Sequence, residues 1–474
     1  MRWIVVIFFG LISTLTFAQA GQDENWFRAD FRDEGRRVGQ NCKLYNFMSV
    51  GACAYTLFTD HPLHIATGSM PPQNGFGLGL AYVAARNTDN WRLSWSIDAV
   101  GATNGAAWRA GGYLKLIHTP VPPVGVSKPS PGTPATNPKK HVVSEHPFTV
   151  FNLYAQAISL DKLNYFGLGN DTTLAGASVF GMTQTIVGAN VTKPVWELPA
   201  LSKLNLSLFG AMNGRFVSIR GTGGQSVPSI GTIYDDATAP GLSSQPGFLQ
   251  LGQGVRIKPV IGDHLELNYS GSLQEFIAPS SSQDTFERWT VDLNHTFYLY
   301  GYTESGPKTT NMTGPNECAP SAQDCPKISR SRNLNGSIGV RLLLSESMNS
   351  ASKIPFYFDP TLGGQDINSS LTLGSYRDYR FRAPNYLLLQ ETFEHSIWGP
   401  FGVKFMADQG RVALDRGDVG FSNLKHSFAA GLTLRAGGFP MVSMMFAWGG
   451  PEGHHNIFNM NTGLLGGGAR PLLD

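Results

Sequence analysis

The sequence has few charged residues and, after its first twenty positions, no long hydrophobic run. Charged residues make up 15% of the 474-residue chain, and the formal net charge is +2 at pH 7. No basic patch favours nucleic acid as a partner. No later stretch approaches the roughly 20 apolar residues that a membrane-spanning helix needs. These absences argue against a helical membrane protein and against a nucleic-acid-binding protein.

Signatures of enzymes and metal sites are also scarce. No G-x-S-x-G sequence is present, and His295 lies in an apolar strand register without a matching serine motif. The pair His454-His455 follows a Gly- and Pro-rich stretch that is typical of a solvated turn. The cysteines have neither CxxC spacing nor a neighbouring His cluster. We therefore expect no catalytic residues, no metal site and no cofactor.

The N-terminus predicts export. Arg2 precedes a run of apolar and small residues from Ile4 to Ala18, and Ala18-Gln19-Ala20 provides an A-x-A cleavage site. A membrane anchor fits less well, because the run is too short to span a bilayer comfortably. We predict a signal peptide over residues 1–20 and a mature chain that starts near Gly21.

Export permits disulfides, and the chain has four cysteines. Four cysteines allow three connectivities, and proximity in sequence favours Cys42 with Cys53 and Cys318 with Cys325. The second pair lies among Pro, Asn and Ser residues, which indicates a loop tip closed by its own bridge.

Strict period-two alternation is the main positive signal. Around Trp91 it separates an apolar set (Trp91, Leu93, Trp95, Ile97, Ala99) from a polar set (Arg92, Ser94, Ser96, Asp98). Such alternation places one kind of side chain on each face of a β-strand. Similar runs occur around residues 265–269, 289–293 and 428–435. Many strands of this kind, separated by polar loops such as 120–146, 222–246 and 306–330, predict a large antiparallel sheet.

Composition and length suit a barrel. The 55 glycines relieve crowding on curved sheets, and the 11% of aromatic residues can form girdles at membrane interfaces. A mature chain of ~450 residues accommodates roughly sixteen strands. The predicted fold is all-β: a transmembrane antiparallel β-barrel of about 16 strands with a short N-terminal extension. A soluble secreted β-sandwich would have a similar composition and remains the alternative.

The predicted domains are the signal peptide, an extension over residues 21–73 and the barrel over residues 74–474. The extension does not alternate and begins with mixed charges around Trp26, Phe27 and Phe31. We predict a helix in it, lying at or inside the barrel mouth; a flexible leader is the alternative.

The most specific sequence signals lie in the last hundred residues. They are the segments Leu373–Arg382, Trp398–Phe405, Met406–Gly410 and Phe421–Arg435, together with Tyr165–Asp171 in the first half. This succession resembles the C-terminal barrel of the bacterial surface antigen family. That superfamily includes the barrel-assembly insertases and the two-partner secretion transporters.

The resemblance implies a loop inside the barrel. In that family a motif of the form aliphatic-Arg-Gly-aromatic folds into the lumen, and its arginine pairs with acidic residues of the inner wall. Leu373 and Tyr376 match the outer positions, whereas Gly374 and Ser375 replace the arginine and the glycine. The implied loop residues are Leu373, Ser375, Tyr376, Arg377, Arg380 and Phe381. The implied wall segment is Phe405, Asp408 and Gly410, with Asp408 pairing with Arg377, Arg380 or Arg382. An ordinary basic loop is the alternative.

The resemblance also implies a function. The extension is too short for a polypeptide-transport-associated domain, so the chain resembles a barrel-only member of the bacterial cell outer membrane. The implied role is translocation or insertion of protein or lipid, or envelope integrity. Its implied partners are outer-membrane lipid and periplasmic partner proteins, with no nucleic acid. A passive porin-like channel and a soluble secreted β-protein are the competing hypotheses.

Overall fold

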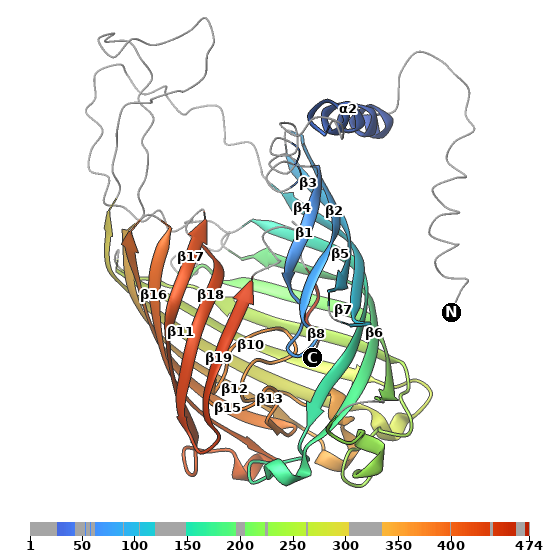
Figure 1. The fold of residues 1–474 in the computed structure, drawn as a ribbon, viewed down its shortest axis with the longest axis vertical. Helices are drawn as coiled ribbons and strands as arrows, with labels where there is room; N and C mark the ends of the chain where they lie inside the picture. Colours follow the sequence, from blue (N-terminus) through green and yellow to red (C-terminus); the bar gives the residue numbers. More distant parts are fainter. Residues whose placement is uncertain are drawn as a thin grey trace, which may run out of the picture. The chain divides into compact units, whose positions relative to one another are not determined.

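A computed structural model gives the fold (Figure 1). It describes residues 26–42, 53, 57, 62–88, 90–103, 105–118, 148–195, 204–222, 226–261, 264–302, 334–398, 400–436, 439–460 and 470–473. The predicted signal peptide and the predicted Cys318–Cys325 bridge lie outside these residues. The chain forms two compact units, Met1–His64 and Ile65–Asp474.

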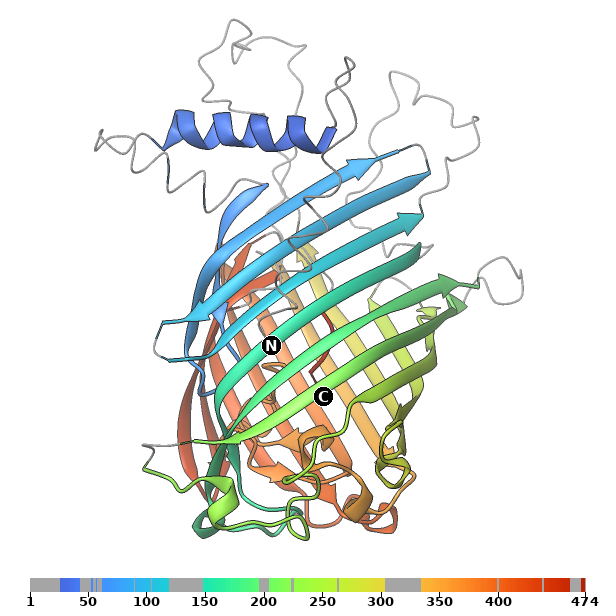
Figure 2. The same ribbon diagram turned by 90° about the vertical axis from the view of Figure 1, so that its right-hand side faces the viewer.

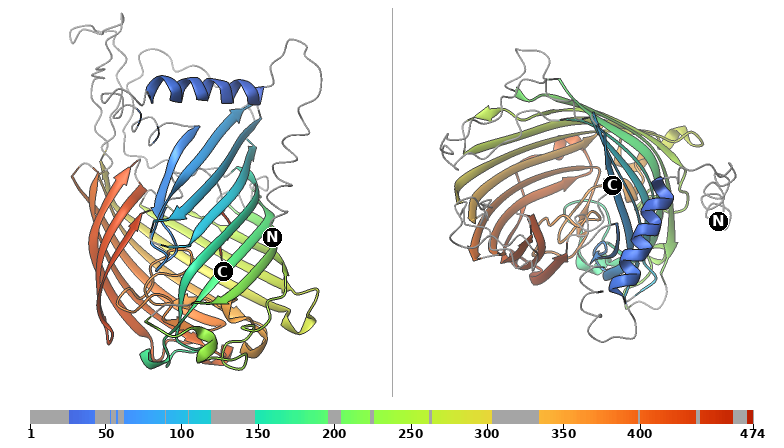
Figure 3. Two further views of the ribbon diagram at one scale, coloured as in Figure 1. Left: turned by 45° about the vertical axis from the view of Figure 1, so that its right-hand side comes forward. Right: turned by 90° about the horizontal axis from the view of Figure 1, so that it is seen from above.

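The second unit is built on one antiparallel sheet that forms a nearly closed barrel (Figures 1 and 3). Seventeen strands make sixteen positions, because the short β9 continues β8 alongside β10. This confirms the predicted all-β barrel of about 16 strands. The strands are β1 (Leu63–Ser69), β2 (Phe76–Asn87), β3 (Trp91–Ala102), β4 (Trp108–His118), β5 (Thr149–Tyr165), β6 (Ser178–Pro194), β7 (Ser207–Gly221), β8 (Phe248–Ile257), β9 (Val260–Ile261), β10 (Leu265–Ile277), β11 (Phe286–Tyr302), β12 (Leu334–Ser347), β15 (Asn385–Trp398), β16 (Phe401–Ala413), β17 (Lys425–Ala436), β18 (Phe439–Gly450) and β19 (Gly453–Met460).

The side chains alternate across this sheet as predicted. In β3, Ile97 is 49% exposed on the outer face, whereas its neighbour Asp98 is 1% exposed on the inner face. In β17, Leu432 is 57% exposed, and Ser427 and Thr433 are buried. Because the side-chain period is two, the antiparallel register carries this division from strand to strand around the barrel.

The outer face of the barrel is apolar. Its exposed side chains include Leu78, Leu80, Leu153, Val187, Leu208, Met212, Phe216, Ile338, Phe405, Leu434, Met444 and Phe458. They are spread over strands from β2 to β19, which are tilted against the barrel axis (Figure 2). A surface with this many exposed large apolar side chains is unlike that of a soluble monomer, whose apolar patches are small.

The inner face of the barrel, in contrast, carries many polar and charged side chains. Its buried side chains include Asp98, Arg109, Gln184, Arg215, Gln250 and Asp408. One end of the interior is instead filled by aromatic side chains, among them Tyr165, Phe180, Phe356 and Phe358. The hydrophobic core of this molecule therefore lies inside the barrel at one end, against connections that fold inward.

The longest inward connection is residues 348–384, which joins β12 to β15. It contains the short 3-10 helices η5 (Ala351–Lys353) and η6 (Phe356–Phe358) and the two-stranded pair β13 (Thr361–Leu362) and β14 (Phe381–Arg382). Other connections carry η1 (Leu174–Gly176), η3 (Ile230–Thr232), η4 (Ser282–Asp284) and η7 (Arg416–Asp418). We call residues 348–384 the lumen loop.

In the first unit, the predicted helix is present as α2 (Trp26–Asn41), and the predicted Cys42–Cys53 disulfide is formed. Glu34 on this helix accepts hydrogen bonds from the Arg37 guanidinium and from the Leu63 backbone N–H. Within the predicted extension over residues 21–73, β1 pairs with β2 in the main sheet. This strand is seven residues long and ends before Pro71-Pro72, so its alternation is too brief to distinguish it from loop.

Among the described helices, none has the length and apolar character needed to cross a membrane.

Candidate functional site: the loop inside the barrel

The lumen loop lies inside the ring of strands (Figure 3). Leu373, Ser375, Tyr376 and Phe381 are at most 3% exposed, and the Tyr376 and Phe381 rings pack edge to face at 5.1 Å. The two rings belong to a hydrophobic cluster that includes Leu388 and Val412 of the barrel wall. This part of the lumen loop is therefore packed in the interior of the barrel.

Leu373 is fixed to the wall through its backbone. Its N–H donates to Asp408 Oδ2 at 3.0 Å, and Gln390 Nε2 donates to Asp408 Oδ1 at 3.0 Å. Leu373 has φ +46°, a left-handed conformation that is costly for a branched side chain. The hydrogen bond to Asp408 and the burial of Leu373 stabilise this conformation, so Asp408 orients the loop.

Gly374 lies in a tightly packed position. A Cβ there would lie 3.1 Å from Ala447 Cβ and 3.1 Å from Ile457 Cδ1. Next to it, the Ser375 N–H donates to Ser427 Oγ at 2.8 Å, and the Gly450 N–H donates to Ser375 Oγ at 3.0 Å. The glycine thus lets the loop backbone approach β18 and β19 closely, and a side chain at this position would require its neighbours to shift.

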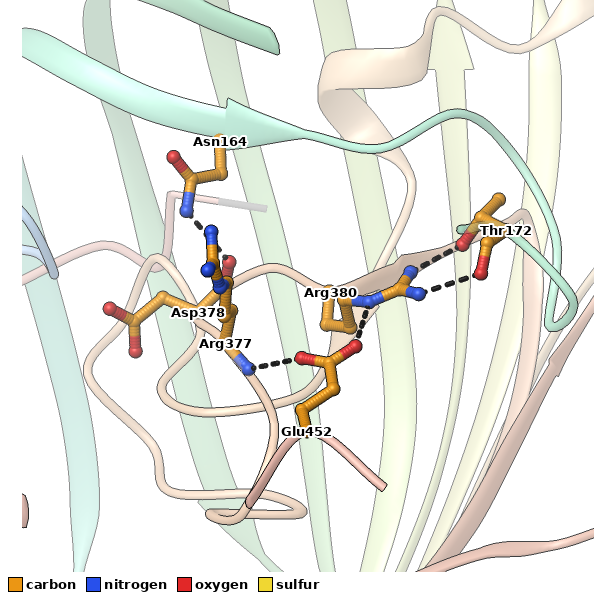
Figure 4. A network of polar contacts seen from close by, with 6 residues as sticks. All are labelled: Asn164, Thr172, Arg377, Asp378, Arg380 and Glu452. Atoms are coloured by element: carbon orange, nitrogen blue, oxygen red, sulfur yellow. Dashed lines mark hydrogen bonds and ion pairs between the residues drawn. The ribbon is translucent and has the colours of Figure 1, made fainter. Parts of the chain in front are cut away.

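The motif's arginine position is occupied by Gly374, and Arg380 is the arginine of the loop that forms a buried ion pair (Figure 4). Its Nε donates to Glu452 Oε1, while Nη1 and Nη2 donate to Thr172 Oγ1 and to the Thr172 carbonyl, each at 2.6 Å. The side chains of Arg380 and Glu452 are only 5% and 7% exposed. The Arg377 N–H also donates to Glu452, at 3.2 Å.

The expected pairing of an arginine with Asp408 is therefore corrected. Asp408 on β16 is already engaged by the Leu373 N–H and by Gln390, whereas Arg380 points toward the turn between β18 and β19. The remaining arginine, Arg382, donates to the carbonyls of Phe356 and Asp359 within its own loop.

The two other predicted wall residues, Phe405 and Gly410, differ in whether they lie near the loop. Phe405 is 48% exposed on the outer face, so it belongs to the apolar band and does not contact the loop. At Gly410 a Cβ would lie 2.9 Å from Leu362 Cδ1 and 3.1 Å from the Leu387 carbonyl. Gly410 therefore permits close approach of β13 to the wall, as a wall residue should.

The segment Tyr165–Asp171 meets the lumen loop in space, although more than 200 positions separate them in sequence. The Gly169 N–H donates to the Arg382 carbonyl at 2.7 Å. Asn170 Oδ1 accepts from the Val412 N–H at 3.4 Å, and Asn170 Nδ2 donates to the Asn423 carbonyl at 3.3 Å. Segments that the sequence resemblance singled out separately thus form one site.

An aromatic cluster surrounds a buried carboxyl group at the base of the loop. Asp359 is 2% exposed, and neither of its carboxylate oxygens has a hydrogen-bond partner among the residues that the structure describes. Burial raises the pKa of Asp359 to about 8, although Arg288 and Arg382 act in the opposite direction. Arg288 donates to the Phe358 carbonyl at 2.6 Å and lies over the Phe276 and Phe286 rings.

Sequence reasoning missed Glu452, Thr172 and Asp359. Glu452 lies in Gly449-Gly450-Pro451-Glu452-Gly453, where the turn composition conceals a buried acid. Thr172 directly follows the singled-out segment Tyr165–Asp171 and could have been included with it. Among the described residues, no group of three or more His, Cys, Asp or Glu side chains could hold a metal ion.

Comparison with solved structures finds similarity to CdiB from Acinetobacter baumannii at 9% identity, TM-score 0.46, covering 84% of this chain and 58% of that one. CdiB from Escherichia coli matches at 10% identity, TM-score 0.47, with 84% and 62% covered. BamA from Haemophilus ducreyi lacking POTRA domains 1–3 matches at 10% identity, TM-score 0.40, with 85% and 69% covered.

Similarity at this level concerns the fold alone, and this chain spans about three fifths of the length of the two CdiB chains. No family model and no curated protein matches the sequence.

Proposed function

We propose that this protein is a bacterial outer-membrane β-barrel that translocates or inserts polypeptide, with a lumen obstructed by its own loop. The observation that carries the proposal is the lumen loop, which is folded into the barrel and fixed to the wall through Leu373–Asp408 and Arg380–Glu452. A loop held by buried contacts can be released by a substrate or a partner. Periplasmic proteins that deliver the substrate are the partners the proposal requires.

The outer surface supports a membrane location. Exposed large apolar side chains extend over most strands, and buried polar side chains face inward. Lipid satisfies the first set, and the antiparallel pairing around the nearly closed barrel satisfies most backbone hydrogen bonds within the sheet. A soluble secreted β-protein would expose the same apolar band to water at a large cost in free energy.

Fractionation and gel migration test the membrane location. We expect the protein in the outer-membrane fraction and a faster-migrating form in unheated gel samples, because a folded barrel resists detergent. Recovery from the soluble periplasm, together with migration that does not depend on heating, would contradict the proposal.

Conductance in planar bilayers separates an obstructed barrel from a passive porin-like channel. We expect the full chain to give small or intermittent currents, and a variant with residues 363–379 replaced by a short Gly-Ser turn to give larger ones. The replacement starts after β13 and ends before β14, so their pairing is kept. A double substitution of Lys404 and Glu394, an inner ion pair of 3.1 Å between β16 and β15, is the control. A large, stable pore from the full chain would favour the porin hypothesis.

Insertion at the barrel seam is a second candidate, favoured by a cavity of about 400 Å³. It is lined by the turn between β1 and β2, by Asn456–Phe458 of β19 and by Gln365 and Asp378 of the lumen loop. In the described part of the chain, no run of paired residues joins β19 to β1 or β2, and an unpaired edge can accept a further strand. Engineered disulfides across this seam should block insertion while leaving translocation through the lumen intact.

A further inference from the structure

The C-terminal segment Arg470–Leu473 lies inside the ring of strands, beside the inner faces of β3 to β7 (Figures 2 and 3). Arg470 anchors it: Nη2 lies 2.5 Å from Asp98 Oδ2, and the guanidinium lies over the Tyr113 ring at 5.9 Å. Arg109 Nη2 lies 3.8 Å from the same oxygen. Asp98 is 1% exposed, so this ion pair is shielded from water.

The other contacts of this segment are to its backbone. Arg215 Nη2 donates to the Leu472 carbonyl at 2.9 Å, and Gln184 Nε2 donates to the Leu473 carbonyl at 3.0 Å. The Leu473 N–H donates to Asn368 Oδ1 of the lumen loop at 2.9 Å. The Leu472 side chain is 65% exposed, so the wall contacts its carbonyl and leaves its side chain unconstrained.

Arg215, which donates to the Leu472 carbonyl, is itself held in place by neighbouring side chains. Arg215 Nε donates to Asn213 Oδ1 at 3.1 Å and to Gln250 Oε1 at 2.6 Å. Arg215, Asn213 and Gln250 are each at most 5% exposed. A buried arginine oriented by two neighbours presents its remaining donors in a fixed direction, which reduces the entropy lost on binding.

We propose that the inner wall of β3, β4, β6 and β7 is a binding site for an extended polypeptide, and that Arg470–Leu473 occupies it in cis. Donors aimed at backbone carbonyls bind a chain largely without regard to its side chains, as a site for a polypeptide in transit requires. Asp98 adds a preference for a basic residue two positions before the first bonded carbonyl. The identity of the ligand as a transported polypeptide rests on the proposed function.

A peptide titration tests the site. The barrel is truncated after Met460, and the labelled, amidated peptide Gly-Ala-Arg-Pro-Leu-Leu (residues 468–473) is followed by fluorescence anisotropy. We expect saturable binding to the truncated barrel and at least about tenfold weaker binding to the full chain, whose own segment competes at a high effective concentration. Equal binding to both, or no saturable binding to the truncated barrel, would overturn the proposal.

Substitutions in the wall test which groups bind. In the truncated barrel, Asp98→Asn should weaken peptide binding about tenfold or more. Asp292→Asn is the matched control, because Asp292 also faces inward and pairs with Arg341 at 2.9 Å, on β11 and β12. It should leave binding unchanged. Equal effects of the two variants would refute a role for Asp98.

A peptide variant distinguishes a site that binds many sequences from a site that binds only the protein's own C-terminal segment. Replacing Leu472 by Ser in the peptide should change affinity less than about threefold, since only its carbonyl is bound. A tenfold or greater loss of affinity would mean that the wall binds only this sequence. The contact would then serve only to hold the C-terminal segment in place.

The full chain provides a measurement that needs no truncation. Leu473 is 6% exposed, so a Leu473→Cys variant should react slowly with maleimide, and adding Asp98→Asn should accelerate labelling about tenfold. An unchanged rate in a folded barrel, judged by gel migration, would count against the proposal. Peptide binding does not depend on membrane location or conductance, so failure here and failure of the proposed function are read separately.

Discussion

The ion pair between Arg380 and Glu452 should be the main attachment of the lumen loop, and it can be tested by a double-mutant cycle. Both side chains are nearly inaccessible to water, and Arg380 also donates two hydrogen bonds of 2.6 Å to Thr172. The cycle consists of Arg380→Ala, Glu452→Gln and the double variant. Lys404 and Glu394, whose side chains are 26% and 22% exposed, provide the control pair.

The magnitudes follow from burial. Removing one partner of a buried ion pair costs about 3–5 kcal/mol, because the other charge is left without compensation. Arg380→Ala should reach this range, since it leaves Glu452 buried and also frees both Thr172 acceptors. The coupling energy should be about 1–3 kcal/mol, as for residues in one buried network. The more exposed control pair should show about 0.2–1 kcal/mol.

Equilibrium unfolding in guanidinium, with the barrel in phospholipid vesicles and tryptophan fluorescence as the signal, gives the four free energies. The same variants should increase the currents in planar bilayers, because a detached loop obstructs the lumen less. A coupling energy no larger than that of the control pair would refute the reasoning. So would a destabilised Arg380→Ala barrel with unaltered currents, since the pair would then stabilise the wall without holding the loop.

Three further predictions concern single residues. Because burial raises the pKa of Asp359 to about 8, the folded state binds the proton more tightly than the unfolded state, and unfolding free energy should fall as pH rises from about 5 to 8; Asp359→Asn should remove this loss and be the more stable form at pH 9. Gly410→Ala should destabilise the barrel by about 1–3 kcal/mol through a clash with Leu362, whereas Gly101→Ala, with nothing within 4 Å, should have little effect. Leu432→Arg should cost about 2–4 kcal/mol in vesicles if its position is near the bilayer midplane, well above the cost of Leu432→Ala.

The strands were predictable because their signal is local. Alternation around Trp91 is a property of consecutive residues, and the burial of Asp98 beside the exposed Ile97 follows from it directly. In β16, Phe405 is exposed on the outer face, although the resemblance implied that it forms part of the wall that contacts the loop.

The partners inside the barrel were not predictable in this way. Arg380 and Glu452 are 72 positions apart, and their pairing depends on how the loop is threaded through the barrel. Gly374 is an example: it is closely approached by Ala447 and Ile457, which belong to strands far along the chain. The resemblance implied a loop in the lumen, but the contacts of residues 348–384 depend on packing between segments that sequence adjacency does not reveal.

The interior of the barrel is occupied from two sides. The lumen loop is fixed mainly to β15 through β19, at Gln390, Asp408 and Ser427, whereas Arg470–Leu473 is fixed to β3 through β7. They meet at a hydrogen bond between Asn368 and the Leu473 N–H. A polypeptide that displaces the C-terminal segment therefore also removes a contact of the loop. If the site binds a polypeptide as proposed, that binding would therefore remove one of the hydrogen bonds that hold the lumen loop.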